Sequence, residues 1–111
     1  MKIWKHAVDL VEKVYKMTEN FPDNEKYCLT NQIRKCAVSI PSNISEGAAR
    51  KSDKEFLNFI NIALGSLAEL ETQYIIAERL KYTEEKTLYE DIEKMKSLII
   101  GLRNYLLNKQ K

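Results

Sequence analysis

The chain of 111 residues has few of the residues that form the tight turns of β structure, with only three glycines and two prolines. Those numbers are too small for the many tight turns of a sandwich or a barrel. Long hydrophobic runs are also missing, because no stretch approaches the roughly 18 uninterrupted apolar residues of a membrane span. Asp9 and Glu12 stand where a signal peptide would have its apolar run. We therefore expect a cytoplasmic protein without a membrane segment.

Side chains that carry chemistry are sparse as well, with one histidine and two cysteines. No acid lies three residues before His6, so the Glu-x-x-His pairs of a di-iron bundle are missing. Cys28 and Cys36 would lie about 12 Å apart along one helix, beyond the reach of a disulfide. No further pair of ligands completes a zinc site, and no glycine loop or nucleophile with its base is apparent. We expect no metal, no cofactor and no enzymatic activity.

Apolar residues recur at the spacing of three and four that marks one face of an amphipathic helix, along almost the whole chain. Phe21-Pro22 ends the first repeat, because the residue before a proline avoids the α region. Ser52 and Glu55 form a capping box, and Thr83 is a candidate N-cap. The sequence predicts a single domain over residues 1–111 with four helices. Their approximate ranges are 2–20, 24–47, 53–81 and 84–108.

Short links between helices favour antiparallel neighbours, so the expected fold is all-α, an antiparallel up-down four-helix bundle. Pro41 lies inside the second helix, where it removes a hydrogen bond and predicts a kink rather than a break. Gly47 is a plausible C-terminal cap of that helix. Gly65 lies among small residues in the third helix, which predicts a close backbone approach there.

Two of the predicted helices carry a second apolar stripe beside the first. In the first helix this stripe is Trp4, Val8, Val11 and Tyr15, and in the third it is Leu57, Leu64 and Ile75. Such faces are wider than a monomeric bundle needs, and surplus apolar surface is typical of an interface. We therefore expect the chain to form a homo-oligomer.

The formal net charge is only +2, but charge is unevenly distributed. Residues 31–51 carry four bases and one acid, and residues 96–111 carry four bases and no acid. Residues 52–95 between them carry ten acids and five bases. If the fold brings the two basic segments together, they form a basic face that attracts a polyanion. The alternative is a set of solvated helix faces, with cations at a helix C-terminus.

Four cations of the first basic segment are candidates for contacts to phosphates, with nearby aromatic residues available for base stacking. The candidate nucleic-acid-binding cations are Arg34, Lys35, Arg50 and Lys51, and the aromatic residues are Trp4, Tyr27 and Tyr105. The structural alternative is an Arg34–carboxylate pair within a set of helix-to-helix hydrogen bonds. The sequence has no groove-reading helix or RNA-binding signature that would indicate base-specific recognition.

The segment LTNQIRKCAVSIPSNISEG, residues 29–47, resembles the signature of one family, and GSLAELETQ, residues 65–73, resembles its second block. The family is the four-helix-bundle proteins encoded in intervening sequences of bacterial 23S ribosomal RNA genes, also labelled ribosomal S23-like. The Trp4 segment and Phe21-Pro22 also fit, so the likeness covers nearly the whole chain. Cys36 stands where a small residue such as alanine is usual in the family.

The resemblance implies an up-down four-helix bundle that assembles into a ring-like homopentamer. It also implies kinship with the accessory variability proteins of diversity-generating retroelements, which bind nucleic acid and a reverse transcriptase. Among the family's basic positions, it carries over Arg34, Lys35 and Arg50.

Two hypotheses of function follow. The first is a non-enzymatic oligomeric module that binds RNA, or nucleic acid generally, through a basic surface repeated by symmetry. The second is a protein-interaction adaptor or scaffold without direct nucleic-acid contact, whose exposed apolar helix face docks a partner protein.

Overall fold

The computed structural model describes residues 1–109, which fold into four α-helices and one short 3-10 helix. The helices are α1 (Lys2–Thr18), η1 (Asp23–Glu25), α2 (Leu29–Ala48), α3 (Asp53–Arg79) and α4 (Leu88–Lys109). This part of the chain contains no strand, which confirms the all-α class with four helices. Within the same residues, every helix is too short or too polar to span a bilayer.

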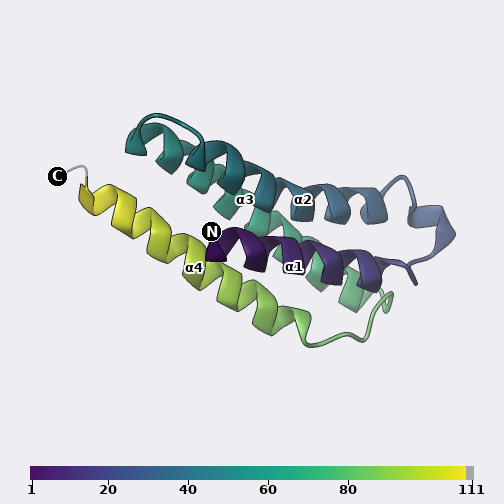
Figure 1. Cartoon of the computed structure of the whole chain (residues 1–111). Coiled ribbons are helices and arrows are strands. Elements are labelled where there is room, and N and C mark those ends of the chain that lie inside the picture. The colour runs from purple at the N-terminus through teal and green to yellow at the C-terminus, as the bar shows by residue number, and fades with distance from the viewer. Residues whose placement is uncertain (110–111) are drawn as a thin grey trace.

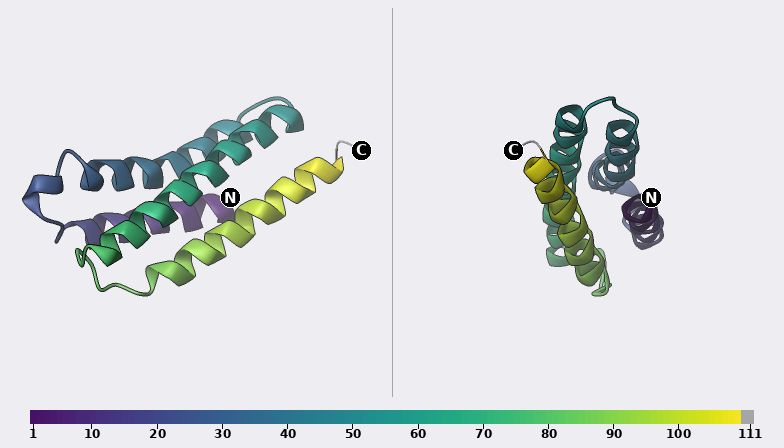
Figure 2. Two further views of the ribbon diagram at one scale, coloured as in Figure 1. Left: turned by 180° about the vertical axis from the view of Figure 1, so that it is seen from behind. Right: turned by 60° about the vertical axis from the view of Figure 1, so that its left-hand side comes forward.

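The four helices lie along one elongated body of 48 × 24 × 19 Å. In Figure 1, α1 and α3 run in one direction and α2 and α4 return in the other. The two views of Figure 2 agree that α3 lies between α2 and α4 while α1 lies against α2. The contact between α2 and α3 is the most extensive of any helix pair, and among the α-helices that touch, α1 and α4 have the least extensive contact.

The core is built from the first apolar stripe of each helix, as the spacing predicts. Its largest fully buried side chains are Tyr74, Ile33, Ile40, Ile44, Ile60, Leu67, Leu70, Leu88, Ile92, Met95, Ile99 and Leu106. Each such aliphatic side chain contributes about 1.5–3 kcal/mol when it leaves water. Of the second stripes, Leu57 and Leu64 are partly buried, whereas Trp4 and Tyr15 are exposed.

The predicted start of the second helix was wrong. Residues 23–25 form η1, and α2 begins only at Leu29. The Glu25 carboxylate accepts the Leu29 N–H (3.3 Å) through one oxygen and the Tyr82 hydroxyl (2.8 Å) through the other. A local carboxylate thus satisfies a donor that a longer helix would have used. The first helix also ends earlier than predicted, at Thr18 instead of residue 20.

The α3–α4 connection also differs from the prediction, which extended α3 to residue 81 and began α4 at residue 84. Lys81 has φ 62°, and the Tyr82 N–H bonds the Ala77 carbonyl while the Lys81 N–H bonds that of Glu78. This is a Schellman ending, with lysine where glycine is usual. Thr83 does not cap α4: its hydroxyl accepts the Glu85 N–H in a local turn.

Neither Gly47 nor Gly65 has the role that the sequence suggested for it. Gly47 is helical and does not cap α2; a Cβ at this position would lie 2.7 Å from the Phe59 Cβ and 2.8 Å from the Phe56 Cδ1. A Cβ at Gly65 would meet no atom within 4 Å. The close approach of α2 and α3 is therefore at Gly47, and the prediction for Gly65 was wrong.

Two other local predictions concern helix α2 and the start of α3. Helix α2 runs without interruption through Pro41, so one helix spans this region and the bend itself stays a prediction. Ser52 caps α3 as predicted, because its hydroxyl accepts the Glu55 N–H at 3.1 Å.

Candidate nucleic-acid interface

The four candidate cations fall into two pairs at opposite ends of α2. Arg34 and Lys35 lie in its second turn, and Arg50 and Lys51 follow its last residue, Ala48. The residues between them correspond to about 24 Å of helix. The structure therefore does not join all four into one cluster, and each pair has its own surroundings.

Arg34 is held in place by the last turns of α1. Its Nε donates to the Thr18 hydroxyl at 2.7 Å, and Nη2 donates to the Tyr15 carbonyl at 3.4 Å. The guanidinium carbon lies 4.5 Å from the centroid of the Tyr15 ring, which is a cation–π contact. The expected Arg34–carboxylate pair does not form within residues 1–109.

A groove borders Arg34 on the surface between α1 and α2, with a volume of about 520 Å³. The residues of this α1–α2 groove are Tyr15, Asn31, Arg34, Lys35, Val38 and Ser39. They include two cations and no acid. Lys35 is exposed and forms no ion pair within the described part of the chain. Since Tyr15 and Val38 are each 41% exposed, the groove offers both positive charge and flat apolar surface.

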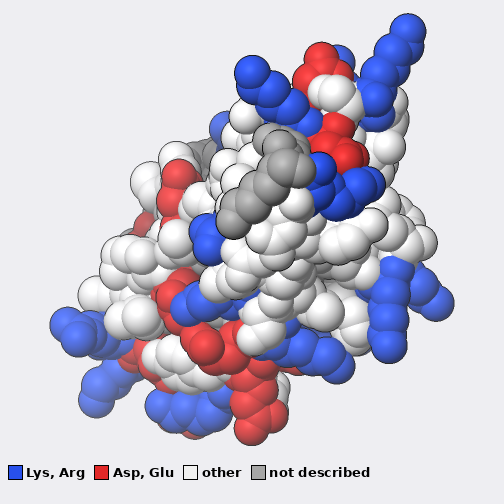
Figure 3. Space-filling view, turned by 90° about the vertical axis from the view of Figure 1, so that its left-hand side faces the viewer, with Lys and Arg blue, Asp and Glu red and all other residues white. Residues whose placement is uncertain are grey.

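The second pair lies in a mixed electrostatic environment. Arg50 forms an ion pair with Glu46 (2.9 Å) and lies over the Phe59 ring, whereas Lys51 has no ion pair among the residues described. Figure 3 faces this end of the molecule and shows acidic side chains between the basic ones. Neighbouring carboxylates oppose the approach of a polyanion, so this pair is the weaker candidate.

The cations of the C-terminal segment are largely paired with acids. Lys96 lies 3.4 Å from a Glu71 oxygen and 3.1 Å from a Glu93 oxygen, and Lys109 lies 3.0 Å from Asp53. Lys111 lies outside the described residues. These pairs fit the solvated-face alternative for Lys96 and Lys109, whereas Arg103 between them forms no ion pair in the described part of the chain.

The aromatic residue of this groove is not one of those that the sequence suggested for base stacking. Trp4, Tyr27 and Tyr105 are exposed, but none of them lines it. Tyr15 does, and it was noted only as part of the second stripe of the first helix. The sequence does contain a signal for this contact. The end of the first helix faces the start of its antiparallel neighbour, and this arrangement places Tyr15 beside Arg34.

The two segments that carry the family resemblance meet across the α2–α3 seam. The Cys36 thiol donates to a Glu69 oxygen at 3.1 Å, and the Ser39 and Ser66 hydroxyls are 2.7 Å apart. Burial, reinforced by the hydrogen bond to Glu69 and its charge, raises the pKa of Cys36 to about 11. The thiol therefore stays protonated near neutral pH.

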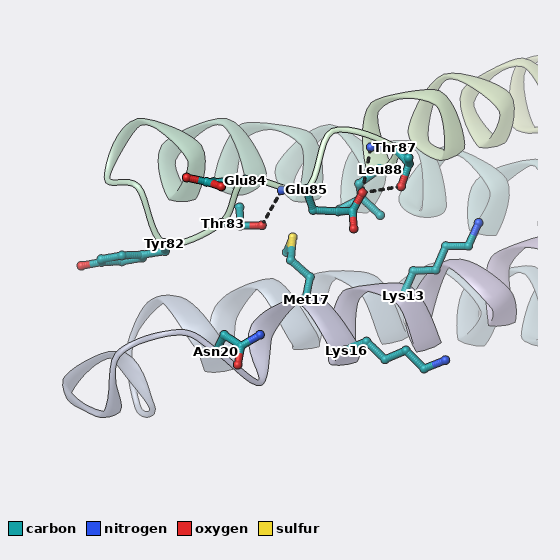
Figure 4. A pocket seen from close by; sticks show the side chains of 10 residues that line it. All are labelled: Lys13, Lys16, Met17, Asn20, Tyr82, Thr83, Glu84, Glu85, Thr87 and Leu88. Atoms are coloured by element: carbon teal, nitrogen blue, oxygen red, sulfur yellow. Dashed lines mark hydrogen bonds between the residues drawn. The ribbon is translucent and has the colours of Figure 1, made fainter.

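A separate hollow of about 480 Å³ lies between α1 and the α3–α4 connection. Figure 4 shows the Met17 side chain pointing into it and the Glu85 carboxylate bonded to Thr87. Its lining contains two lysines and two glutamates, so its charge is balanced. Among residues 1–109, no three His, Cys, Asp or Glu side chains come close enough to hold a metal ion.

Fold and surface together define a small all-α protein of four helices with a cationic groove between the first two. The profile of the family described as 23S rRNA-intervening sequence protein matches residues 1–102, and the chain belongs to this family. None of the curated proteins matches it. A solved structure of a protein of unknown function from the S23 ribosomal protein family of Bacteroides thetaiotaomicron is similar in fold. It is 22% identical, with a TM-score of 0.67 over 98% of each chain.

Proposed function

We propose that this protein is a non-enzymatic, oligomeric nucleic-acid-binding module and that the α1–α2 groove is its contact surface. The observation that carries the proposal is the composition of the groove, which contains Arg34 and Lys35 and no carboxylate. A polyanion gains from both charges there without repulsion from a neighbouring acid. Lys51, at the far end of α2, adds a second and weaker contact to phosphate.

We further propose that each protomer is an antiparallel up-down bundle bent at Pro41, and that protomers assemble into a homo-oligomer, a pentamer by family resemblance. Large exposed apolar side chains along α3 and at the residue that follows it support self-association: Ile62 and Leu80 are each 51% exposed and Ile76 is 43% exposed. These three side chains lie on one side of the helix. In such an assembly the groove is repeated on every protomer, so several weak sites act together.

The test is the binding of a labelled structured RNA with unpaired loops, measured by fluorescence anisotropy at low and moderate salt. We expect binding that weakens as salt rises, because phosphate contacts release counterions. Lys35→Gln is expected to weaken binding and to reduce the salt slope by about one. The matched control is Lys94→Gln, which removes the same charge from an exposed position on α4. Absence of binding at both salt concentrations would refute the proposal.

The alternative function, a protein-interaction adaptor, is favoured by the exposed Trp4. It borders a hollow of about 470 Å³ that Val8, Pro41 and Ser42 also line. Aromatic side chains beside such hollows are common anchors of protein interfaces. A partner that stays bound to the purified protein after nuclease treatment, and is lost in Trp4→Ala, would favour the adaptor.

A further inference from the structure

We infer that the α1–α2 groove recognises an unpaired nucleobase, which stacks on the Arg34 guanidinium, so that the module selects single-stranded over duplex nucleic acid. This inference rests on the proposed function and assigns Arg34 a different part from the phosphate contact that the sequence suggested. Tyr15 and Arg34 form the stacking surface, and Lys35 beside them meets the phosphate.

The geometry of Arg34 fixes the plane on which a base would stack. A guanidinium is a flat group, and its central carbon lies 4.5 Å from the centroid of the Tyr15 ring, so the two side chains are in contact. Both side chains line the groove, so a base that enters it meets the ring and the guanidinium together. Arginine planes and aromatic rings are the usual platforms for unpaired bases, whose π-faces are hidden inside a duplex.

Two hydrogen bonds hold the plane in position before any ligand arrives. Nε donates to Thr18 and Nη2 to the Tyr15 carbonyl, so the arginine has little rotamer freedom left to lose. Thr18 is itself oriented, because its hydroxyl lies 2.9 Å from the Val14 carbonyl, to which it donates. Such pre-organisation lowers the entropic cost of binding.

The rest of the groove matches a nucleotide in charge and size. Lys35 is the next residue along α2 and forms no ion pair in the described part of the chain, whereas Asn31 supplies a polar side chain for a base edge. The volume of about 520 Å³ is in the range of small-molecule sites, too small to enclose a duplex. The positive charge of the groove therefore complements a polyanion, and its flat surface complements a base.

The experiment compares a 12-nucleotide single-stranded RNA with a hairpin of the same composition, using fluorescence anisotropy and the full chain. We expect the single strand to bind more tightly. Tyr15→Ala is expected to weaken its binding by about 5- to 100-fold, the usual effect of losing a stacked base. The slope of log Kd against log salt stays the same, because no phosphate contact is lost. Tyr15→Phe, which keeps the ring, binds like the wild type.

A measurement on the wild-type protein makes the test independent of folding in the variants. A 2-aminopurine base placed in the single strand loses fluorescence when it stacks, so binding should quench it. Arg34→Lys, which keeps the charge and loses the plane, should bind with less quenching. Equal affinity for strand and hairpin, or binding without quenching, would overturn the inference and leave the proposed function standing. If neither RNA binds at low salt, both fail.

Discussion

At the scale of single residues, Gly47 sets the spacing between α2 and α3. We expect Gly47→Ala to lower the free energy of unfolding by about 1–3 kcal/mol, because the new methyl group would overlap Phe59 and Phe56 in a packed seam. Urea denaturation followed by circular dichroism measures the change. The matched control is Gly65→Ala, which should raise stability by up to about 1 kcal/mol, since alanine is the better helix former and meets no atom there. Equal effects at the two glycines would contradict this account.

The Thr18 hydroxyl joins α1 to α2, because it is buried and accepts the Arg34 Nε while donating within its own helix. Thr18→Val keeps the shape of the side chain and leaves the guanidinium without this partner. We expect a loss of about 1–3 kcal/mol of unfolding free energy, since a charged donor is left unsatisfied. Thr72→Val is the control, because its hydroxyl bonds only the Ala68 carbonyl on an exposed face. A loss no larger than that of the control would show that the bond contributes little.

At the scale of the helices, the Schellman ending of α3 contains a residue that its backbone conformation disfavours. Lys81 has φ 62°, a left-handed conformation that costs a residue with a Cβ about 1–2 kcal/mol. We expect Lys81→Gly to raise the unfolding free energy by about 0.5–1 kcal/mol, less than this full cost, because the greater freedom of glycine in the unfolded chain offsets part of the gain. Lys81→Ala serves as the comparison: it removes the charge but keeps the Cβ and should not stabilise. Thermal and urea unfolding of both variants decide the matter.

The helices themselves could be predicted from the sequence, whereas their ends could not. Core positions follow the three-and-four spacing, which depends only on the geometry of a helix. The ends depend on side chains that bond the local backbone: Glu25 takes the Leu29 N–H, and Thr83 takes the Glu85 N–H. Such bonds compete with helical ones at similar energies, so the pattern of apolar residues does not reveal them.

The charged residues of the candidate site could likewise be predicted from the sequence, whereas their surroundings could not. Arg34 and Lys35 were chosen for their charge, and they do lie together without an acid. The contact of the Tyr15 ring with Arg34 depends on how α1 and α2 pack, and the separation of Arg50 from Arg34 depends on the length of α2. The pattern of charge alone encodes neither.

At the scale of the whole molecule, the prediction concerns assembly. We expect the wild-type protein to be larger than a protomer at micromolar concentration, and Ile62→Asp with Ile76→Asp to convert it to monomers by placing charges on the proposed contact. Size-exclusion chromatography with light scattering measures the mass. Val38→Asp, at a comparably exposed apolar position in the α1–α2 groove, is the control and should leave the mass unchanged. A wild-type monomer would remove the case for assembly through α3.

The contact between α1 and α4 is small, and this affects how the fold can open locally. Because α1 rests mainly on α2, an opening that lifts α1 away breaks little besides the α1–α2 contact. That motion would also separate Tyr15 from Arg34 and take the groove apart. A nucleic-acid strand bound across α1 and α2 would then hold the two helices together, because its binding energy opposes the detachment of α1. Occupancy of the groove and rigidity of the N-terminal helix would rise and fall together.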